Sequence, residues 1–187
     1  MSANPLTPVP PTHSPSAWIR RFLPLVPAGG LVLDLAAGGG RHVRLLCETG
    51  YRVVAADRDV AALRAAFGGD SRCEIVEQDL EDSGPWRLGE GYDGIVVANY
   101  LWRPLLPALA AALAPRGVLL YETFMVGNER FGKPSNPDFL LRPGELLAAY
   151  LGRLEIVAFE QGAIAVPRPA MIQRVAAVNG AVGVLPG

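Results

Sequence analysis

Apolar and polar residues follow one another along this chain in blocks that predict strands and helices in turn. Short apolar runs bounded by glycine, proline or acidic residues are typical of buried strands. They predict strands over Leu31–Leu35, Arg52–Asp57, Glu74–Gln78, Tyr92–Asn99, Val118–Phe124, Leu154–Phe159 and Ala170–Val178. Stretches with helical spacing or end signals predict helices after an N-cap at Ser14 and over Arg41–Thr49, Val60–Phe67, Leu105–Leu113 and Pro143–Leu151.

The order of these elements predicts an α/β fold. Strand–helix alternation favours three layers, with helices on both faces of a largely parallel sheet and right-handed crossovers. The last two strands have no helix between them, so we expect an antiparallel hairpin at the C-terminal end. With 187 residues, half of them hydrophobic, residues 14–187 can form a single domain. Residues 1–13, which are rich in proline, are expected to form a flexible arm.

The stretch from Leu31 to Arg41 combines a buried strand, an acid and a glycine turn that leads into a helix. Consecutive glycines let a ligand approach the backbone without meeting a Cβ atom. The start of the helix adds free N–H groups and a partial positive charge, which suit a polar or anionic ligand. Because an unpaired buried acid is costly, we expect Asp34 to bind the glycine-turn amides or the ligand. A tight turn with a solvated Asp34 is the simpler alternative.

Polar side chains also end two other predicted strands. Asp57 follows Gly40 at about the spacing where doubly wound folds place a carboxylate for ribose hydroxyls. Asn99 ends the fourth strand and is followed by Tyr100 and Arg103. In open α/β sheets ligands bind beyond the carboxyl ends of the strands, so Asn99 and its neighbours are predicted to form a wall of the site.

These residues resemble the signature of class I S-adenosylmethionine-dependent methyltransferases, which is an acid followed by glycines at alternate positions. Asp34, Gly38 and Gly40 match this signature, and Ala36 replaces its first glycine. Within the family, residues 33–42 and 50–57 look most like small bacterial methyltransferases of the tellurite-resistance type.

The resemblance covers Ala17 to Val178 and implies a three-layer, Rossmann-like fold. The sheet of that fold is seven-stranded and mostly parallel, with one antiparallel strand. The implied cofactor is S-adenosyl-L-methionine, whose adenine amino group the family binds with an acid at the place of Asp79. A helix before the first strand closes over the cofactor in related proteins, so a lid is one interpretation of that helix here. The expected cofactor-binding residues are Asp34, Ala36, Gly38, Gly40, Asp57, Asp79, Leu80 and Asn99.

Two alternatives come from other functional classes. A nicotinamide-dependent α/β oxidoreductase would carry the dinucleotide fingerprint G-x-G-x-x-G. Gly38 and Gly40 begin that pattern, but its third glycine falls at Val43. The other alternative is a catalytically idle methyltransferase-like protein that binds a partner through residues 125–142.

Methyl transfer is an in-line displacement in which the protein positions the reactants and excludes water. A base is needed only for a protonated acceptor, and the candidates are Glu122 and, less favoured, His13. Arg103 is a second catalytic candidate, as a fixed cation beside the pocket. His42 is expected to be a first-turn helix residue. No Ser-His-Asp set and no metal-ligand spacing stands out.

The acceptor is expected to be a small molecule that residues 125–142 select. Met125–Arg142 has no periodic pattern and leaves the edge of the site, so we expect a mobile lid in which Phe131 covers the acceptor. The Asn-Pro-Pro-Tyr motif of many amino-group methylating enzymes is absent, since Asn99 is followed by Tyr-Leu-Trp. That argues weakly against DNA adenine or glutamine side chains as acceptors.

Charge and hydropathy indicate neither a nucleic-acid nor a membrane partner. The net charge is −1, and no apolar run approaches the length of a membrane span. Cys47 and Cys73 are expected to be reduced core residues, which favours a cytoplasmic protein.

Overall fold

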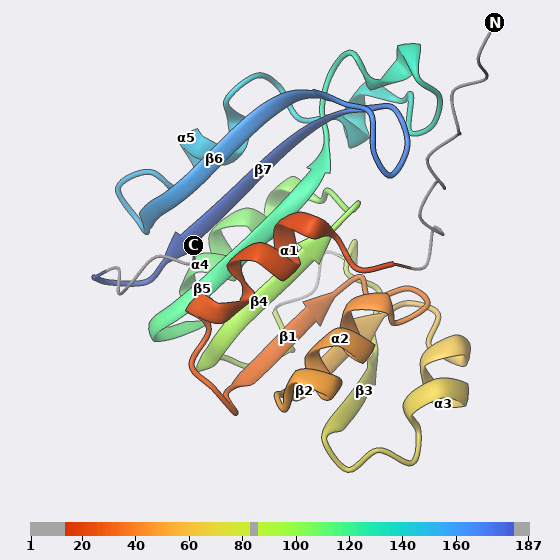
Figure 1. Ribbon diagram of the computed structural model, residues 1–187, viewed down its shortest axis with the longest axis vertical. Coiled ribbons are helices and arrows are strands. Elements are labelled where there is room, and N and C mark those ends of the chain that lie inside the picture. Colours follow the sequence, from red (N-terminus) through yellow and green to blue (C-terminus); the bar gives the residue numbers. More distant parts are fainter. Residues whose placement is uncertain (1–13, 83–85, 182–187) are drawn as a thin grey trace, which may run out of the picture.

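A computed structural model describes residues 14–82 and 86–181, and within them one sheet of seven strands forms the centre of the molecule (Figure 1). The strands are β1 (Leu31–Leu35), β2 (Arg52–Asp57), β3 (Cys73–Glu77), β4 (Tyr92–Ala98), β5 (Leu113–Phe124), β6 (Glu155–Ile164) and β7 (Ala170–Val178). Their order across the sheet is β3-β2-β1-β4-β5-β7-β6. β1 to β5 pair in parallel, whereas β7 is antiparallel to both β5 and β6. The predicted sheet, including its C-terminal hairpin, is therefore confirmed.

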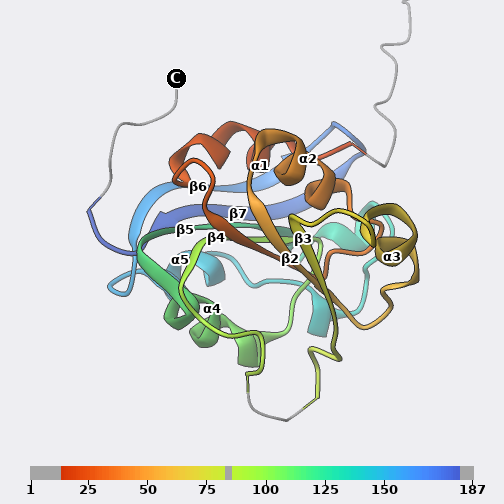
Figure 2. The ribbon, with the colours of Figure 1, turned by 90° about the horizontal axis from the view of Figure 1, so that it is seen from below.

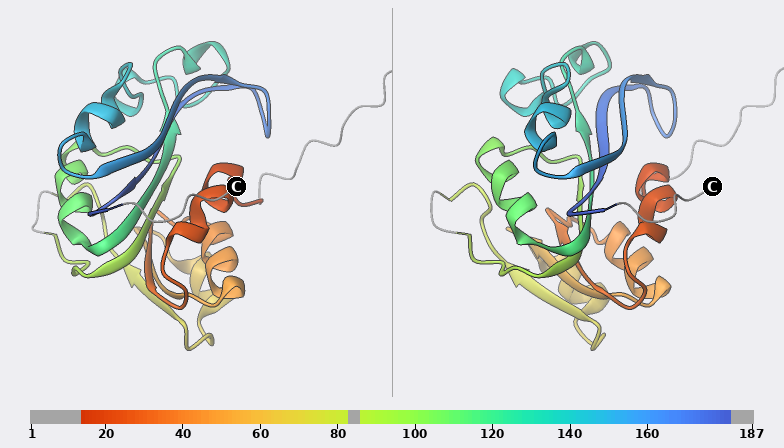
Figure 3. Two further views of the ribbon diagram at one scale, coloured as in Figure 1. Left: turned by 60° about the vertical axis from the view of Figure 1, so that its left-hand side comes forward. Right: turned by 90° about the vertical axis from the view of Figure 1, so that its left-hand side faces the viewer.

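Helices cover both faces of the sheet and complete the three layers. Figure 2 shows α1, α2 and α3 on one side, with α4 and α5 on the other, and the two views of Figure 3 agree. The α-helices are α1 (Ala17–Phe22), α2 (Arg41–Thr49), α3 (Ala61–Phe67), α4 (Leu106–Ala112) and α5 (Glu145–Tyr150). Short 3-10 turns are η1 (Leu23–Leu25), η2 (Arg103–Leu105), η3 (Asn128–Arg130) and η4 (Pro137–Phe139).

Alternation along β1 explains why its sequence is almost entirely apolar. Val32 packs with the residues of α1 and α2, whereas Leu33 and Leu35 pack with those of α4 and α5. Both faces of this central strand are buried, as expected for a parallel sheet covered by helices. Asp34 shares the α1/α2 face with Val32, because side chains alternate along a strand.

Several predicted boundaries were wrong. The N-cap of α1 is Ser16, whose Oγ accepts hydrogen bonds from the Trp18 and Ile19 amides at 3.1 and 3.3 Å, and not Ser14. β5 starts at Leu113, because Leu113 already pairs with Tyr92 across a register shift. β6 continues to Ile164, paired with β7 along its length. His13 lies outside the described residues.

Candidate active site at the carboxyl edge of the sheet

The glycine turn between β1 and α2 is open where a ligand would need space and closed where a helix packs. Ala36, Gly38 and Gly40 all have positive φ, of 56°, 53° and 77°. A Cβ atom on Gly40 would lie 2.5 Å from Cε2 of Phe67 in α3, so only glycine fits there. A Cβ on Gly38 or Gly39 would have no atom of the described residues within 4 Å. The turn therefore presents bare backbone to an empty space at Gly38 and Gly39.

Asp57, the last residue of β2, holds this turn from the neighbouring strand. Its Oδ2 accepts the Gly38 amide at 2.8 Å, and its Oδ1 accepts the Asp59 amide at 3.1 Å. We expected Asp34 to accept an amide of the glycine turn, but Asp57 accepts the Gly38 amide instead. Parallel pairing brings the ends of β1 and β2 together, which places Asp57 beside the turn.

Asp34 lies beneath the turn and is only 1% exposed. Its Oδ2 has no hydrogen-bond partner among the described residues. Burial raises its pKa to about 7, although the nearby Arg41 charge and the Val43 backbone N–H act in the opposite direction. Binding of Asp34 to a ligand stays a prediction.

Three adjoining cavities follow the carboxyl ends of the strands. The Asp57 pocket, of about 340 Å³, is lined by Ala36, Asp57, Arg58, Asp79, Leu80, Glu81, Tyr100 and Phe139. The glycine pocket, of about 540 Å³, is lined by Ala36–Arg41, Arg44, Ala98 and Asn99. The Thr123 pocket, of about 240 Å³, is lined by Glu81, Asn99, Tyr100, Leu101, Thr123, Phe124, Pro134 and Phe139. The three share lining residues, so they form one groove.

This groove brings together all the predicted cofactor-binding residues except Asp34. Ala36 borders both the Asp57 pocket and the glycine pocket. Asn99, which has a positive φ of 59°, borders the glycine pocket and the Thr123 pocket. Their roles toward a cofactor stay predictions.

Arg103 does not line the groove but clamps the segment that does. Its guanidinium donates to the Glu145 carboxylate at 2.6 and 3.0 Å. It also donates to the carbonyls of Asp138 and Leu140 at 2.7 and 2.8 Å. These carbonyls flank Phe139, so Arg103 fixes the backbone on either side of a pocket residue. Its contacts are those of a positioning residue, and a direct catalytic role stays a prediction.

Glu122 is likewise absent from the lining of these pockets. Its Oε2 pairs with Arg174 at 3.2 Å. Arg174 also pairs with Glu160 at 2.5 Å and lies over the Trp18 ring, 4.7 Å from its centroid. This network ties α1 to the hairpin side of the sheet, and a role for Glu122 as a base stays a prediction.

His42 is buried in the first turn of α2, as expected from the sequence. Its Nε2 accepts the Ser16 amide at 3.1 Å, which joins the start of α1 to the start of α2. Burial and the neighbouring Arg41 lower its pKa to about 3, so the ring stays neutral and can accept this bond.

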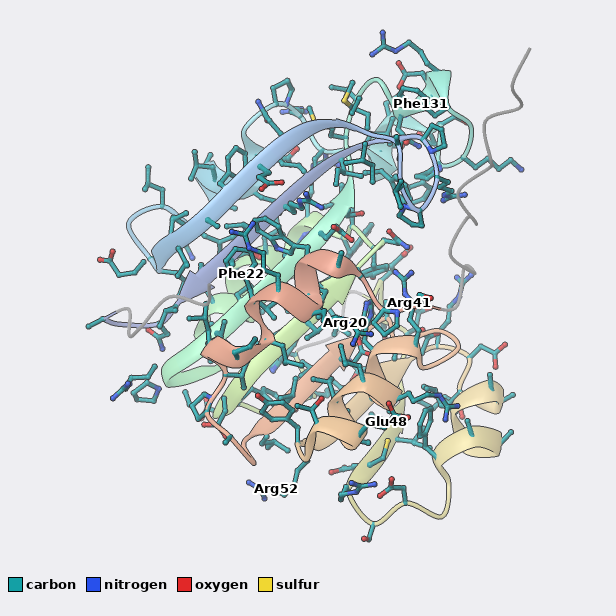
Figure 4. All side chains as sticks on the ribbon, in the orientation of Figure 1. Arg20, Phe22, Arg41, Glu48, Arg52 and Phe131 are labelled. Atoms are coloured by element: carbon teal, nitrogen blue, oxygen red, sulfur yellow. The ribbon has the colours of Figure 1, made fainter. Side chains whose placement is uncertain are left out.

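The aromatic residue that the 125–142 segment contributes to the groove is Phe139. Phe131, which we expected to cover the acceptor, lines none of the three pockets and is 46% exposed (Figure 4). Asn128 is buried and bonded to the Pro134 carbonyl and the Met171 amide, at 2.9 and 3.1 Å. Together with the Arg103 contacts at Asp138 and Leu140, these bonds hold the segment at several points, and its mobility as a lid stays a prediction.

Sequence reasoning also missed Glu81 and undervalued Tyr100. The Glu81 amide bonds to Asp79 Oδ1 at 2.9 Å, a local turn that directs residue 81 along the groove. The Tyr100 hydroxyl is buried with no hydrogen-bond partner in the part of the chain that the structure describes, and burial raises its pKa well above the usual range. A turn acid and an aromatic directly after a strand are the signals that could have indicated both residues.

No family model matches the sequence. Ribosomal protein L11 methyltransferase from Chromohalobacter salexigens is 33% identical over 100 residues, which are 51% of this chain but only 33% of that protein. This chain therefore matches about a third of the length of its curated relative.

Solved structures of methyltransferases share the fold. TehB from Haemophilus influenzae has a TM-score of 0.67 at 19% identity, over 82% of this chain and 59% of that one. A putative S-adenosylmethionine-dependent methyltransferase from Listeria monocytogenes has a TM-score of 0.63 at 13% identity, over 86% and 97%. The putative methyltransferase solved with the Trm112 activator of Haloferax volcanii has a TM-score of 0.70 at 17% identity, over 90% of each chain. The chain therefore has the fold of class I S-adenosylmethionine-dependent methyltransferases and resembles those of the TehB type.

Proposed function

We propose that this protein is an S-adenosylmethionine-dependent methyltransferase that acts on a small-molecule acceptor. The observation that carries the proposal is the continuous groove, in which an open glycine turn lies beside Asp57 and a separate small pocket adjoins both. A cofactor pocket next to an acceptor pocket is what transfer between two bound molecules requires. The fold shared with methyltransferases supports the same function.

The residues of the groove fit the cofactor. Gly38 and Gly39 leave room for a ligand against the backbone. The carboxylate oxygens of Asp57 each accept one amide bond and retain a lone pair for ribose hydroxyls. Asp79 and Leu80 line the same pocket and would hold the adenine ring, whose amino group is a donor. Arg41 and Arg44 line the glycine pocket, where they would face the carboxylate of the methionine part.

The bound cofactor would supply a methyl group already activated on a positive sulfur. The chain's own residues then need only bind, orient and exclude water. Phe139 borders both the Asp57 pocket and the Thr123 pocket, where it would shield the transfer from solvent. Asn99 borders the acceptor side and offers an amide for orienting a polar group.

The test is calorimetric titration of the purified protein with S-adenosylmethionine, S-adenosylhomocysteine and NADH. We expect both sulfur compounds to bind and NADH not to bind. The second step measures transfer of labelled methyl groups into a metabolite pool. Preferential NADH binding would favour an oxidoreductase, whereas cofactor binding without transfer into any pool would favour an idle partner-binding protein.

A further inference from the structure

The Thr123 pocket has a chemical character of its own. Three aromatic residues line it, Tyr100, Phe124 and Phe139. Glu81 supplies the one ionisable carboxylate of the lining, and no lysine or arginine is among the described residues that form it. Its volume of about 240 Å³ lies below the range of pockets for drug-sized ligands, so its ligand is small.

Aromatic faces beside a carboxylate attract a positively charged group. The negative face of a ring binds a cation, and sites that recognise ammonium groups are often built from several such rings. An anion would meet aromatic residues and the Glu81 carboxylate without a compensating cation among the described lining residues. Resting on the proposed function, we propose that the methyl acceptor is an amine, bound in the Thr123 pocket as an ammonium group or its neutral form.

The geometry holds these groups in place before a ligand arrives. Arg103 clamps the Asp138 and Leu140 carbonyls, so Phe139 is fixed between the two pockets although its side chain is 43% exposed. The Asp79 carboxylate holds the Glu81 amide. Arg168 already lies over the Phe124 ring, 5.5 Å from its centroid, so the ammonium group is assigned mainly to Tyr100 and Phe139.

The reaction balances without a further reagent. The amine first releases a proton to water, which frees its nitrogen lone pair. That lone pair forms the new N–C bond to the methyl carbon as the S–C bond breaks and its electron pair returns to sulfur, leaving a thioether. The methylated nitrogen then carries the positive charge. Glu81 binds and orients the N–H groups and is neither oxidised nor reduced.

The experiment compares three phenyl-containing probes of similar size and different charge on protein saturated with S-adenosylhomocysteine. At pH 7 benzylamine is a cation, benzyl alcohol is neutral and benzoate is an anion. We expect benzylamine to bind about tenfold more tightly than benzyl alcohol, and benzoate to bind least. Equal or tighter binding of benzoate would overturn the proposal.

Matched variants show whether the signal comes from this pocket. Glu81→Gln and Phe139→Ala should each weaken benzylamine binding by about three- to tenfold. The controls are Glu48→Gln, an exposed acid on α2 away from the groove, and Phe131→Ala, an exposed aromatic of the same segment (Figure 4). Equal effects in the pocket and control variants would overturn the assignment.

Two further measurements are needed. One distinguishes a free amine from a lysine side chain as the acceptor, and the other separates failure of the amine proposal from failure of the proposed function. Labelled methyl transfer to benzylamine and to a lysine-containing peptide distinguishes a free amine from a lysine side chain, and N-methylation of either supports an amine acceptor. Methylation of oxygen or sulfur compounds alone would overturn it. If S-adenosylhomocysteine fails to bind, the proposed function fails, and the charge preference of the empty protein for the same three probes still tests the pocket.

Discussion

The carboxylate of Asp57 at the end of β2 accepts a 2.8 Å hydrogen bond from the backbone amide of Gly38, in the turn that follows β1. One acid thus fixes the shape of the glycine turn and faces the pocket beside it. Replacing Asp57 should therefore affect a ligand in two ways, through a lost direct acceptor and through a looser turn.

We expect Asp57→Ala to weaken S-adenosylhomocysteine binding by about 1.5–3 kcal/mol, because two ribose hydroxyls lose a charged acceptor. Asp57→Asn should cost less, since its amide oxygen can still accept the Gly38 N–H. Calorimetric titration of both variants measures these losses. Asp59→Ala, two residues along the chain, is the control. An unchanged dissociation constant in Asp57→Ala would contradict the assignment.

Gly39 allows a test of the open turn that leaves the fold alone. Its backbone is not in the left-handed region, and an added Cβ would meet no atom within 4 Å among residues 14–82 and 86–181. Gly39→Ala should therefore keep its thermal stability but lose at least about tenfold in cofactor affinity, because the methyl group occupies ligand space. Gly69→Ala, equally free of contacts, is the matched control. Normal binding by Gly39→Ala would mean that the ligand does not approach this backbone.

The sheet and the grouping of most predicted site residues along one groove could be predicted because their signals are local in sequence. β1 and β2 were found within their observed bounds, since an apolar run ended by an acid or glycine identifies a buried parallel strand. Strand ends in such a sheet meet at one edge, which is why Gly38, Asp57 and Asn99 could be grouped without coordinates.

The Thr123 pocket could not be predicted because it depends on contacts distant in sequence. Arg103 meets Asp138 and Glu145, which lie 35 and 42 residues further along the chain. These bonds hold the backbone beside Phe139, which lines the groove, whereas Phe131 does not line it. Both are phenylalanines in the same aperiodic segment, so no local pattern separates them.

Asp34 should make the protein less stable as the pH rises. Burial raises its pKa from 3.8 to about 7, so between these pH values the folded protein keeps a proton that the unfolded chain has released. The free energy of unfolding then falls with rising pH, by at most ~1.4 kcal/mol per pH unit, and the full penalty remains above pH 7. Asp34→Asn removes this term. Urea unfolding of both proteins from pH 4 to 8 should show that the variant becomes more stable relative to the wild type as the pH rises to about 7. A constant difference in the free energy of unfolding would contradict the raised pKa of Asp34.

His42 should act in the opposite direction. Burial lowers its pKa from 6.5 to about 3, so stability from the neutral ring is present above pH 6.5 and is lost as the pH falls. Between about pH 4 and 6.5 the Asp34 and His42 contributions to stability have opposite signs and should nearly cancel each other. In that window the stability of His42→Gln should fall as the pH rises, and that of Asp34→Asn should increase. Parallel curves for the two variants would disprove the opposing terms.

The clamp on Phe139 predicts a local loss of order when Arg103 is removed. Arg103→Ala frees the Asp138 and Leu140 carbonyls, so the η4 turn loses its tie to α5. The Phe139 and Leu140 amides, which bond within this turn at 3.0 and 3.1 Å, should then exchange hydrogen roughly five- to twentyfold faster. Arg103→Lys should rescue little of this, because an ammonium group cannot reproduce the planar fork that reaches all four acceptor contacts.

Arg130→Ala provides the control, because the Arg130 guanidinium bonds to the Gly127 carbonyl within its own turn. It should leave exchange at Phe139 and Leu140 unchanged. Because Arg103 acts through Phe139, Arg103→Ala should resemble Phe139→Ala in the amine-binding experiment. Both variants should bind benzylamine more weakly, while ligand binding at the glycine pocket should change little. If Arg103→Ala left both hydrogen exchange and benzylamine binding at wild-type values, Phe139 would be held by its packing alone, and Arg103 would have no positioning role.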